Sequence, residues 1–405
     1  MGYLFSKKRF KGTNLLENMK IAIFTDNFPP QLNGAVTATM NLIMGLARRG
    51  HKIYVFAPNF PNISKEFSHK NVIIKRIPSI PAGFYPDFRF TNFLSIKLLY
   101  YLKKEKIQLI QFPSPITLGL QAIILAKILK IPLIGTFHTF FADPQYLKHV
   151  KLDTALVQHL GWYYSKLFYN SCSLITCPSE TTKKELLRKG FTKRIRVISN
   201  GIDGKIFDNS KYLQVRKKYS LGGPLVLFVG RVSHDKNIFY LIDCFKLVIK
   251  EMPNARLLIV GDGPQFTKVK EIINKEDLSR NILLLGRVEH QKLVKSSLFK
   301  ACDLFVTASI TENQPMTILE AQINGLVCIG INKKGMKDLI KDGYNGYLIK
   351  DGDKKGFAKK IILALSNKRL MQKMKENTLA ESKKNDLDNV IDIWEEELKL
   401  LINAS

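Results

Sequence analysis

The C-terminal half of the chain contains two glutamates, Glu312 and Glu320, that are separated by seven residues and lie on either side of a proline. Residues 303–307 (DLFVT) predict a short buried strand, and the residues from Pro315 onward predict a helix with proline in its first turn. Glu312 would then lie in the loop after the strand, and Glu320 about one and a half turns into the helix. Both carboxylates would face the crevice at the carboxyl end of a parallel sheet, where such sheets bind ligands.

The predicted helix N-terminus between these glutamates is suited to an anion. The N–H groups of Met316 and Thr317 would have no acceptor within the helix and would point out of its positive end. A phosphate bound there would lie between the two carboxylates. A simpler interpretation makes Glu312 a solvated loop charge and Glu320 a helix residue favoured by the dipole, and this stretch alone fits both interpretations.

A second group of reactive side chains lies in GRVSHDKN (230–237), between a predicted strand and a predicted helix. Arg231 and Lys236 could converge there on one diphosphate, Arg through its planar fork and Lys as a point charge. Such a pair would neutralise a leaving diphosphate without a metal ion. In a chain this basic, two exposed loop cations are the alternative interpretation.

Two residues of the first half extend this pattern. Gly34 begins a predicted helix, where a residue without Cβ lets a ligand approach the backbone. His138 follows the predicted strand PLIGTF (132–137), where its imidazole could bond a sugar hydroxyl or assist proton movement. A lone histidine is usually a structural residue, so position alone does not make His138 functional.

Strands and helices alternate along the chain in two successive runs, which must position these residues. The first run starts near Met19 with a βαβ unit, and the pattern restarts at Leu225. We therefore expect an α/β protein of two facing, doubly wound Rossmann-like domains with the site in the cleft between them. The predicted divisions are a basic N-terminal extension (1–18), an N-terminal domain (19–205), a C-terminal domain (206–384) and a C-terminal helix (385–405) that packs back on the N-terminal domain.

Charge is the main compositional signal, because 63 Lys and Arg residues oppose 34 Asp and Glu residues, a formal net charge of +29. This excess indicates an anionic partner, which could be nucleic acid, a phosphorylated substrate or an anionic lipid surface, although a lysine-rich genome would produce it without a partner. The five cysteines form no C-x-x-C pair, which argues against a zinc site and favours a reducing cytoplasm. No membrane span or signal peptide is predicted.

Six motifs follow one another in an order that resembles glycosyltransferase family 4, from about Met19 to the last helix. They are TDNFPPQLNGAV (25–36), GTFHTF (135–140), SNGID (199–203), GRVSHDKN (230–237), IVGDGP (259–264) and ENQPMTILEA (312–321). The resemblance implies the GT-B fold, with an acceptor-binding N-terminal domain and a nucleotide-sugar-binding C-terminal domain. It also implies a retaining transfer in which the leaving phosphate accepts the acceptor's proton, with no metal or other cofactor.

The same resemblance implies a role for each candidate residue. The residues that match Arg231 and Lys236 bind the donor diphosphate, the glutamate that matches Glu320 bonds the nucleotide ribose, and the one that matches Glu312 contacts the donor sugar. His138 matches an active-site histidine. The expected catalytic residues are His138, Arg231, Lys236 and Glu312, and the expected donor-binding residues are Gly34, Arg231, Lys236, Glu312, Pro315, Met316, Thr317 and Glu320.

Two motifs depart from the family pattern. Asn33-Gly34 stands where many members have two glycines, and Gln314-Pro315-Met316 stands where many have Gly-Phe or Gly-Leu. The sequence QLNG resembles the QING loop of bacterial diacylglycerol glucosyltransferases. The proline removes one amide near the donor, which leaves the sugar open.

The acceptor must be inferred from the first domain. Residues 84–106 interleave aromatic and basic side chains, which predicts either an amphipathic helix on anionic lipid or aromatics that fill the core. With the net charge and the segment GTFHTFFADPQY (135–146), the chain resembles membrane-surface enzymes that glucosylate diacylglycerol. We therefore expect transfer of glucose from UDP-glucose to 1,2-diacylglycerol at the cytoplasmic face of the cell membrane, with an anionic lipid surface as partner.

Several alternatives remain. Within the family, the substrates could be GDP-mannose and phosphatidylinositol, or the acceptor could be a soluble sugar or polysaccharide precursor. A nucleic-acid-binding protein would need a recognisable module or a basic groove with stacking aromatics, and the sequence shows neither. A catalytically dead binding module is disfavoured by the intact candidate residues, and the oligomeric state is open.

Overall fold

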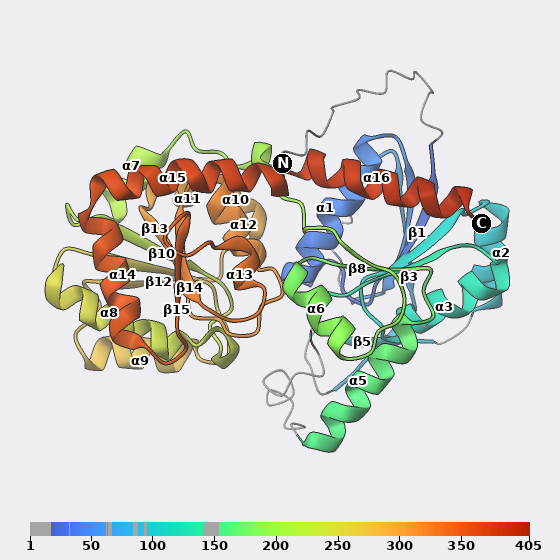
Figure 1. Cartoon of the computed structure of the whole chain (residues 1–405), viewed down its shortest axis with the longest axis horizontal. Helices are drawn as coiled ribbons and strands as arrows, with labels where there is room; N and C mark the ends of the chain where they lie inside the picture. The colour runs from blue at the N-terminus through green and yellow to red at the C-terminus, as the bar shows by residue number, and fades with distance from the viewer. Residues whose placement is uncertain are drawn as a thin grey trace, which may run out of the picture.

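The computed structural model describes residues 18–31, 33–61, 63, 67–83, 88–92, 95–138, 140 and 154–405. The predicted N-terminal extension lies outside the described residues except for Asn18, and so does most of GTFHTFFADPQY. The described residues form two α/β domains that lie side by side (Figure 1).

The first domain is built on a seven-stranded parallel sheet. Its strand order is β3 (Val72–Ile77), β2 (Lys52–Pro58), β1 (Lys20–Phe24), β6 (Leu109–Phe112), β7 (Leu133–Thr136), β8 (Leu174–Cys177) and β9 (Ile195–Val197). The order reverses between β1 and β6, which pair directly. Strands β6, β7 and β8 are buried at every position, as expected for a parallel sheet that helices cover on both faces. The other elements are α1 (Gly34–Arg48), β4 (Ser79–Pro81), β5 (Arg89–Thr91), α2 (Ile96–Lys104), α3 (Thr117–Leu129), α5 (Ala155–Tyr169) and α6 (Glu180–Arg188).

The second domain repeats this plan with six parallel strands. Their order is β12 (Ile282–Gly286), β11 (Arg256–Val260), β10 (Leu225–Val229), β13 (Leu304–Thr307), β14 (Val327–Ile331) and β15 (Gly346–Ile349), with the reversal between β10 and β13. The remaining elements are η1 (Gly204–Ile206), α7 (Tyr212–Tyr219), η2 (His234–Lys236), α8 (Ile238–Glu251), α9 (Phe266–Lys275), α10 (His290–Val294), α11 (Leu298–Ala301), α12 (Met316–Ile323), α13 (Met336–Leu339), α14 (Lys354–Ser366), α15 (Lys368–Ser382), η3 (Lys383–Asn385) and α16 (Leu387–Asn403).

Both sheets have the strand order of the doubly wound Rossmann fold, so the predicted fold class is confirmed. In such sheets ligands bind outside the carboxyl ends of the strands, at the point where the order reverses. The loops after β1 and β6 in the first domain, and after β10 and β13 in the second, are therefore the places where a site is expected.

The last helix, α16, returns to the first domain and lies along α1 (Figure 1). Gly45 of α1 permits this approach, because a Cβ at that position would overlap the Ile391 side chain. His51 Nε2 lies 2.9 Å from Glu395 Oε1 in the same interface. The side chains of α16 that complete the core of the first domain are Leu387, Val390, Ile391, Trp394 and Leu398.

The chain crosses between the domains twice, and the two crossings lie side by side. Ile202 donates its N–H to the Asn385 carbonyl (2.9 Å), and its own carbonyl accepts the N–H of Leu387 (3.0 Å). Asn41 Nδ2 of α1 donates to the Gly201 carbonyl (2.7 Å). These bonds join the two crossing segments to one another and to α1.

The described part of the segment 84–106 has one face that packs in the core and one that is exposed. Leu98 and Leu102 of α2 are buried, and Tyr101 packs edge-on against Tyr54, whereas Tyr100 is exposed. One face of α2 therefore packs in the core, whereas Ile96 and Tyr100 are exposed, and both interpretations of this segment stay open. In the described part of the chain, no helix combines the length and apolar character needed to cross a bilayer.

Truncation of Ile391 to alanine should destabilise the first domain. Ile391 is buried between α16 and α1, and removing such a side chain costs about 2–5 kcal/mol of unfolding free energy. Both tryptophans, Trp162 and Trp394, pack in this domain, so urea denaturation followed by tryptophan fluorescence reports its stability. The exposed Leu400 of the same helix is the matched control, because Leu400→Ala should change stability by less than about 0.5 kcal/mol; equal losses in both variants would contradict the packing described here.

Candidate functional site

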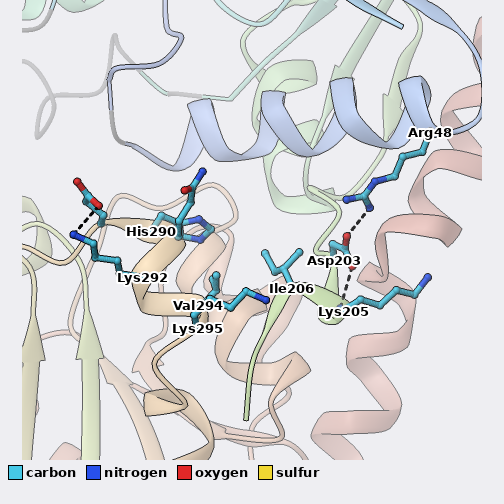
Figure 2. A pocket seen from close by; sticks show the side chains of 10 residues that line it. Arg48, Asp203, Lys205, Ile206, His290, Lys292, Val294 and Lys295 are labelled. Atoms are coloured by element: carbon cyan, nitrogen blue, oxygen red, sulfur yellow. Dashed lines mark hydrogen bonds and ion pairs between the residues drawn. The ribbon is translucent and has the colours of Figure 1, made fainter. Parts of the chain in front are cut away.

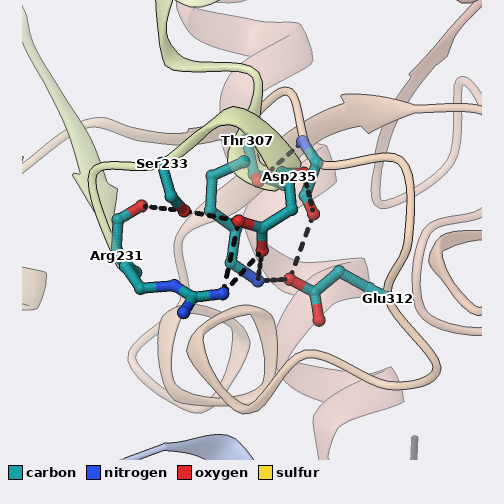
Figure 3. A network of polar contacts seen from close by, with 7 residues as sticks. Arg231, Ser233, Asp235, Thr307 and Glu312 are labelled. Carbon is teal, nitrogen blue, oxygen red and sulfur yellow. Dashed lines mark hydrogen bonds and ion pairs between the residues drawn. The ribbon is translucent and has the colours of Figure 1, made fainter. Parts of the chain in front are cut away.

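Three predicted donor residues meet at the switch point of the second sheet. Arg231 follows β10, Lys236 ends η2, and Glu312 lies in the loop between β13 and α12. Lys236 Nζ forms an ion pair with Glu312 Oε1 (Figure 3). The structure thus brings together side chains from two distant motifs of the sequence.

Each cation of this cluster faces a carboxylate. Arg231 Nη2 lies 3.3 Å from Asp235 Oδ1, and Lys236 Nζ lies 3.8 Å from Asp235 Oδ2 as well as beside Glu312. Burial disfavours the charged lysine, but Glu312 and Asp235 outweigh it and raise the pKa of Lys236. In the described ion pairs of this cluster, two cations therefore face two carboxylates, so these four charges balance.

Two serine hydroxyls hold the carboxylates in place. Ser233 Oγ donates to Asp235 Oδ1 (2.5 Å), and Ser309 Oγ donates to Glu312 Oε1 (3.1 Å) (Figure 3). Hydrogen bonds of this kind favour the ionised carboxylates. An anion that bound Arg231 and Lys236 would have to compete with carboxylates that are already well placed.

Helix α12 begins one residue later than predicted. Pro315 is its N-cap in an extended conformation (φ −68°, ψ 122°), and its carbonyl accepts the N–H of Ile318 (3.1 Å). The proline therefore precedes the first turn instead of lying in it. Met316 and Thr317 are the first residues of the helix, so their N–H groups have no acceptor within it.

Gly34 of the first domain lies opposite the start of α12. It is the first residue of α1, whose N-cap Asn33 accepts the N–H of Val36 through its side chain (3.0 Å). A Cβ on Gly34 would lie 3.6 Å from Met316 Cγ, an ordinary van der Waals distance. The protein itself leaves room for a side chain here, so a need for glycine would come from a ligand.

His138 is linked to the second domain through its backbone. Its carbonyl accepts a hydrogen bond from Asn313 Nδ2 (2.6 Å), and Asn313 directly follows Glu312. Burial lowers the pKa of His138 to about 4, so the imidazole is neutral at physiological pH. Asn313 Oδ1 is buried and has no hydrogen-bond partner among the residues that the structure describes. This loop therefore places a neutral imidazole and Glu312 in one region.

Gln314 makes a second bridge from the same loop to the first domain. Its Oε1 accepts the N–H of Asn200 (2.7 Å), and its Nε2 donates to Ser199 Oγ (2.9 Å). Asn313 and Gln314 belong to the motif that departs from the family pattern. Both residues make contacts between the domains, and Gln314 is one of the residues that depart from the family pattern.

Glu320 lies one helical turn beyond Met316 and is only 2% exposed. Its Oε1 is 2.7 Å from Nε2 of His290, the first residue of α10. The hydrogen bond to Glu320 raises the pKa of His290, although burial opposes this shift. His290 therefore holds the carboxylate that the family resemblance assigns to a ribose.

A pocket of about 830 Å³ lies between the domains, next to His290 (Figure 2). Arg48 of α1 lines it from one side, Asp203 and Lys205 line it from the crossing segment, and α10 lines it from the second domain. Arg48 Nη1 is paired with Asp203 Oδ2 at 2.6 Å. The residues that line this pocket do not include Arg231, Lys236 or Glu312. His290 lines the pocket and also bonds Glu320.

The switch point of the first sheet carries a buried carboxylate, Asp26, directly after β1. Its Oδ1 accepts Thr117 Oγ1 (2.8 Å) and the N–H of Leu118 (3.0 Å) at the start of α3. Burial raises the pKa of Asp26 to about 6 against these hydrogen bonds. Tyr164 of α5 donates to the Pro115 carbonyl (2.8 Å) at the same edge. Asp26 therefore anchors α3 at the carboxyl edge of the first sheet.

Sequence reasoning did not identify four residues that shape the site, which are Asp235, His290, Asn313 and Gln314. Asp235 lies inside the motif GRVSHDKN, and its acidic side chain between two cations was a usable signal. The family roles assigned to the candidate residues stay predictions. In the described ranges, no group of three or more His, Cys, Asp or Glu side chains could hold a metal ion, and independence from a metal also stays a prediction.

Two family models match the chain in succession. Residues 32–205 match "Glycosyltransferase Family 4", and residues 213–380 match "Glycosyl transferases group 1". The chain belongs to glycosyltransferase family 4. The predicted family is thus confirmed, and the protein is a hexosyltransferase.

Curated relatives of this family 4 chain include enzymes named for different sugars. The α-monoglucosyldiacylglycerol synthase of Streptococcus pneumoniae is 28% identical over 82% of this chain and 75% of its own length. The enzyme of the same name from Acholeplasma laidlawii is 26% identical over 90% of this chain and 93% of its own length. A GDP-mannose-dependent α-mannosyltransferase of Corynebacterium glutamicum is 27% identical over 83% of this chain and 78% of its own length.

Solved structures agree on the fold. The crystal structure of Anabaena HepE in complex with UDP-glucose matches with a TM-score of 0.76 at 19% identity, and the match covers 94% of this chain and all of that one. At this identity the likeness establishes the GT-B fold of two facing Rossmann-like domains.

Replacement of Gly34 by alanine should reduce activity without reducing stability. The position is helical and a Cβ there makes only an ordinary contact, so the free energy of unfolding should be unchanged or rise by up to about 1 kcal/mol. If the donor approaches this backbone, kcat/KM should fall at least about tenfold. Gly45→Ala is the control with the opposite pattern, since its Cβ would overlap Ile391 and should lower the melting temperature. Full activity in Gly34→Ala would remove Gly34 from the donor site.

Replacement of His290 by glutamine should remove a pH-dependent part of the stability. The pKa of His290 is raised in the folded state. The bond to Glu320 therefore contributes its full stabilisation of the fold below the unfolded pKa of about 6.5. This contribution is lost as pH rises through the folded pKa. Glutamine can donate to Glu320 but does not titrate. The difference in melting temperature between wild type and His290→Gln should therefore shrink from about pH 5.5 to about pH 8.5, and a constant difference would contradict this assignment.

Proposed function

We propose that the protein transfers glucose from UDP-glucose to 1,2-diacylglycerol, with retention of configuration, at the cytoplasmic surface of the membrane. The observation that carries the donor half of the proposal is the cluster of Arg231, Lys236 and Glu312 at the switch point between β10 and β13. This is the point where a Rossmann-like sheet binds a nucleotide ligand.

In the proposed complex, the donor diphosphate replaces Asp235 and Glu312 as partner of the two cations. Arg231 and Lys236 bind it from the β10 side, and the N–H groups of Met316 and Thr317 bind it from the N-terminus of α12. Because the two carboxylates already balance the two cations, the diphosphate must bind the cations in a better geometry than the carboxylates do. It also gains the hydrogen bonds from the two amides. This exchange would free Glu312 to contact the donor sugar.

Glu320 binds the ribose hydroxyls in this proposal. Its Oε1 is occupied by His290 Nε2, and its Oε2 is the oxygen left to accept from the ribose. The nearly complete burial of Glu320 makes an unsatisfied carboxylate costly, so His290 supports the carboxylate before the nucleotide arrives.

The chemical step needs charge stabilisation at the leaving UDP, which Arg231 and Lys236 supply without a metal. The acceptor oxygen attacks the anomeric carbon on the face that the phosphate leaves, and the departing phosphate oxygen takes the acceptor's proton. His138, whose pKa is about 4, contributes a neutral hydrogen bond to a sugar hydroxyl and no acidic proton. Glu312, released from Lys236 when the diphosphate binds, contacts the sugar hydroxyls and does not act as a nucleophile.

The lipid acceptor is supported by the relatives. Two of them, each aligned over most of this chain, are named for glucosylation of diacylglycerol. The relative that uses GDP-mannose favours a second candidate, in which the same cluster binds the diphosphate of a mannose donor. Arg231 and Lys236 serve either donor, because both donors carry a diphosphate.

The deciding experiment offers UDP-glucose or GDP-mannose with diacylglycerol in neutral detergent micelles and follows nucleotide release and labelled lipid. A glucosylated lipid from UDP-glucose, with no product from GDP-mannose, supports the proposal. A mannosylated lipid from GDP-mannose supports the second candidate. Nucleotide release without any lipid product would exclude diacylglycerol as the acceptor and direct the search to soluble sugars.

Replacement of Lys236 by glutamine should lower kcat about 100-fold or more, because it removes a preorganised charge at the leaving phosphate. Lys246→Gln is the matched control, since Lys246 lies in the same domain and is also paired with a carboxylate, that of Glu276, but stands on α8. The control should keep activity within about twofold of wild type, as expected for a surface pair. Equal activity of the Lys236 and Lys246 variants would contradict the assigned site.

A further inference from the structure

Helix α5 of the first domain exposes an unusual number of apolar side chains. Leu156, Leu160, Tyr163 and Leu167 are between 54% and 67% exposed. At 3.6 residues per turn these four positions fall within about 60° of one another around the helix. We call this set of four residues the α5 stripe.

The opposite face of α5 is already packed. Ser165, Phe168 and Tyr169 are buried, and Phe168 and Tyr169 belong to the core of the first domain. A surface helix of a globular protein normally turns polar residues away from the core. Since α5 is apolar on both faces, its outer face is expected to have a partner.

The surroundings of the α5 stripe are basic. Helix α5 contains no Asp or Glu, and the stretch 155–193, from α5 through α6 to the following turn, contains six Lys and Arg residues against two Glu residues. Lys166 Nζ lies 6.0 Å from the centre of the ring of the stripe residue Tyr163, whereas Lys189 Nζ lies 5.0 Å from the ring of Trp162, which packs on the core side of α5. Lysines that lie along aromatic rings can place their charged ends in a lipid headgroup layer while apolar side chains enter the bilayer.

The helix is also joined to the edge where an acceptor would enter. Tyr164, which follows the stripe residue Tyr163, donates to the Pro115 carbonyl after β6. From this anchor the N-terminal end of α5 reaches out beyond the sheet of the first domain (Figure 1). A surface that holds α5 would therefore lie next to the acceptor edge.

We propose that the α5 stripe docks the protein on an anionic lipid bilayer. Leu156, Leu160, Tyr163 and Leu167 enter the boundary between headgroups and acyl chains, and the neighbouring lysines contact anionic headgroups. The proposal deepens the proposed function and rests on it for the purpose of docking, since a bilayer is where a diacylglycerol acceptor would be found.

A second copy of the chain fits this surface less well than lipid does. A symmetric dimer brings the same patch of both subunits together. It would therefore set Lys166 and Lys189 of one subunit near the same cations of the other, and like charges repel. Anionic headgroups complement the same cations.

The test measures binding of the full chain to sedimenting vesicles in the absence of donor and diacylglycerol. Vesicles of phosphatidylcholine mixed with an equal amount of phosphatidylglycerol are compared with vesicles of phosphatidylcholine alone. Wild type should bind the anionic vesicles, and Leu160→Glu with Leu167→Glu should weaken binding at least about tenfold. Leu160→Ser with Leu167→Ser, which adds no charge, should give an intermediate loss.

The matched control is Leu213→Glu with Leu400→Glu, which places the same charges on exposed leucines of α7 and α16. It should bind vesicles nearly as wild type does, apart from the general effect of two added charges. Ile96→Glu with Tyr100→Glu applies the same test to the exposed residues of α2. The proposal would be overturned if the α7/α16 control lost as much vesicle binding as the α5 variant, or if the α2 variant lost more. It would also be overturned if wild type did not bind the vesicles.

Two further measurements separate docking from folding, dimerisation and catalysis. Sedimentation velocity on wild type and on the α5 variants should give the same mass, and a wild-type dimer that the α5 variants dissociate would overturn lipid docking in favour of a second copy. The α5 variants should keep wild-type activity in detergent micelles and lose activity on vesicles. Vesicle binding without glycolipid in any assay would refute the proposed function and leave docking intact, whereas full vesicle activity of the α5 variants would refute docking alone.

Discussion

The charge balance at the end of β10 is the constraint on which the donor site depends. Burying the charge of Lys236 is costly unless a carboxylate accompanies it, and Glu312 and Asp235 meet that requirement. In the proposed function, the same pairing makes donor binding an exchange of one set of anions for another. Such a site can select a diphosphate by its shape and its number of acceptors, because net attraction alone would not distinguish the diphosphate from the carboxylates already present.

This exchange requires the two domains to be held in a definite arrangement. Gly34 faces Met316 across the interface, Asn313 bonds the His138 carbonyl, and Gln314 bonds the segment that crosses between the domains. All three contacts involve the loop and helix that follow β13. A movement of one domain would therefore strain the bond between the His138 carbonyl and Asn313, the residue that follows Glu312.

Much of this organisation could be predicted from the sequence because it rests on local patterns. Alternating strands and helices predict the two Rossmann-like domains, and the motif around residues 230–237 predicts Arg231 and Lys236 at a strand end. The bond between His290 and Glu320 joins α10 to α12 and has no periodic signal, so sequence reasoning could not find it. Helix α5 escaped notice for a related reason, since a helix that is apolar on both faces looks in sequence like an ordinary core helix. The basic and aromatic segment 84–106 drew attention instead, although Leu98 and Leu102 turn its described helix toward the core.

Little of the net charge of +29 lies in the described ion pairs of the proposed donor site. The cluster at β10 and β13 is balanced, and Arg48 beside the pocket between the domains is paired with Asp203. A diphosphate would therefore meet little of the excess as it binds. The stretch from α5 to β9, in contrast, combines an excess of cations with exposed leucines, and only a surface that is both anionic and apolar matches both properties. Docking on lipid therefore rests on the exposed apolar side chains of α5, to which the nearby cations add complementarity with anionic headgroups.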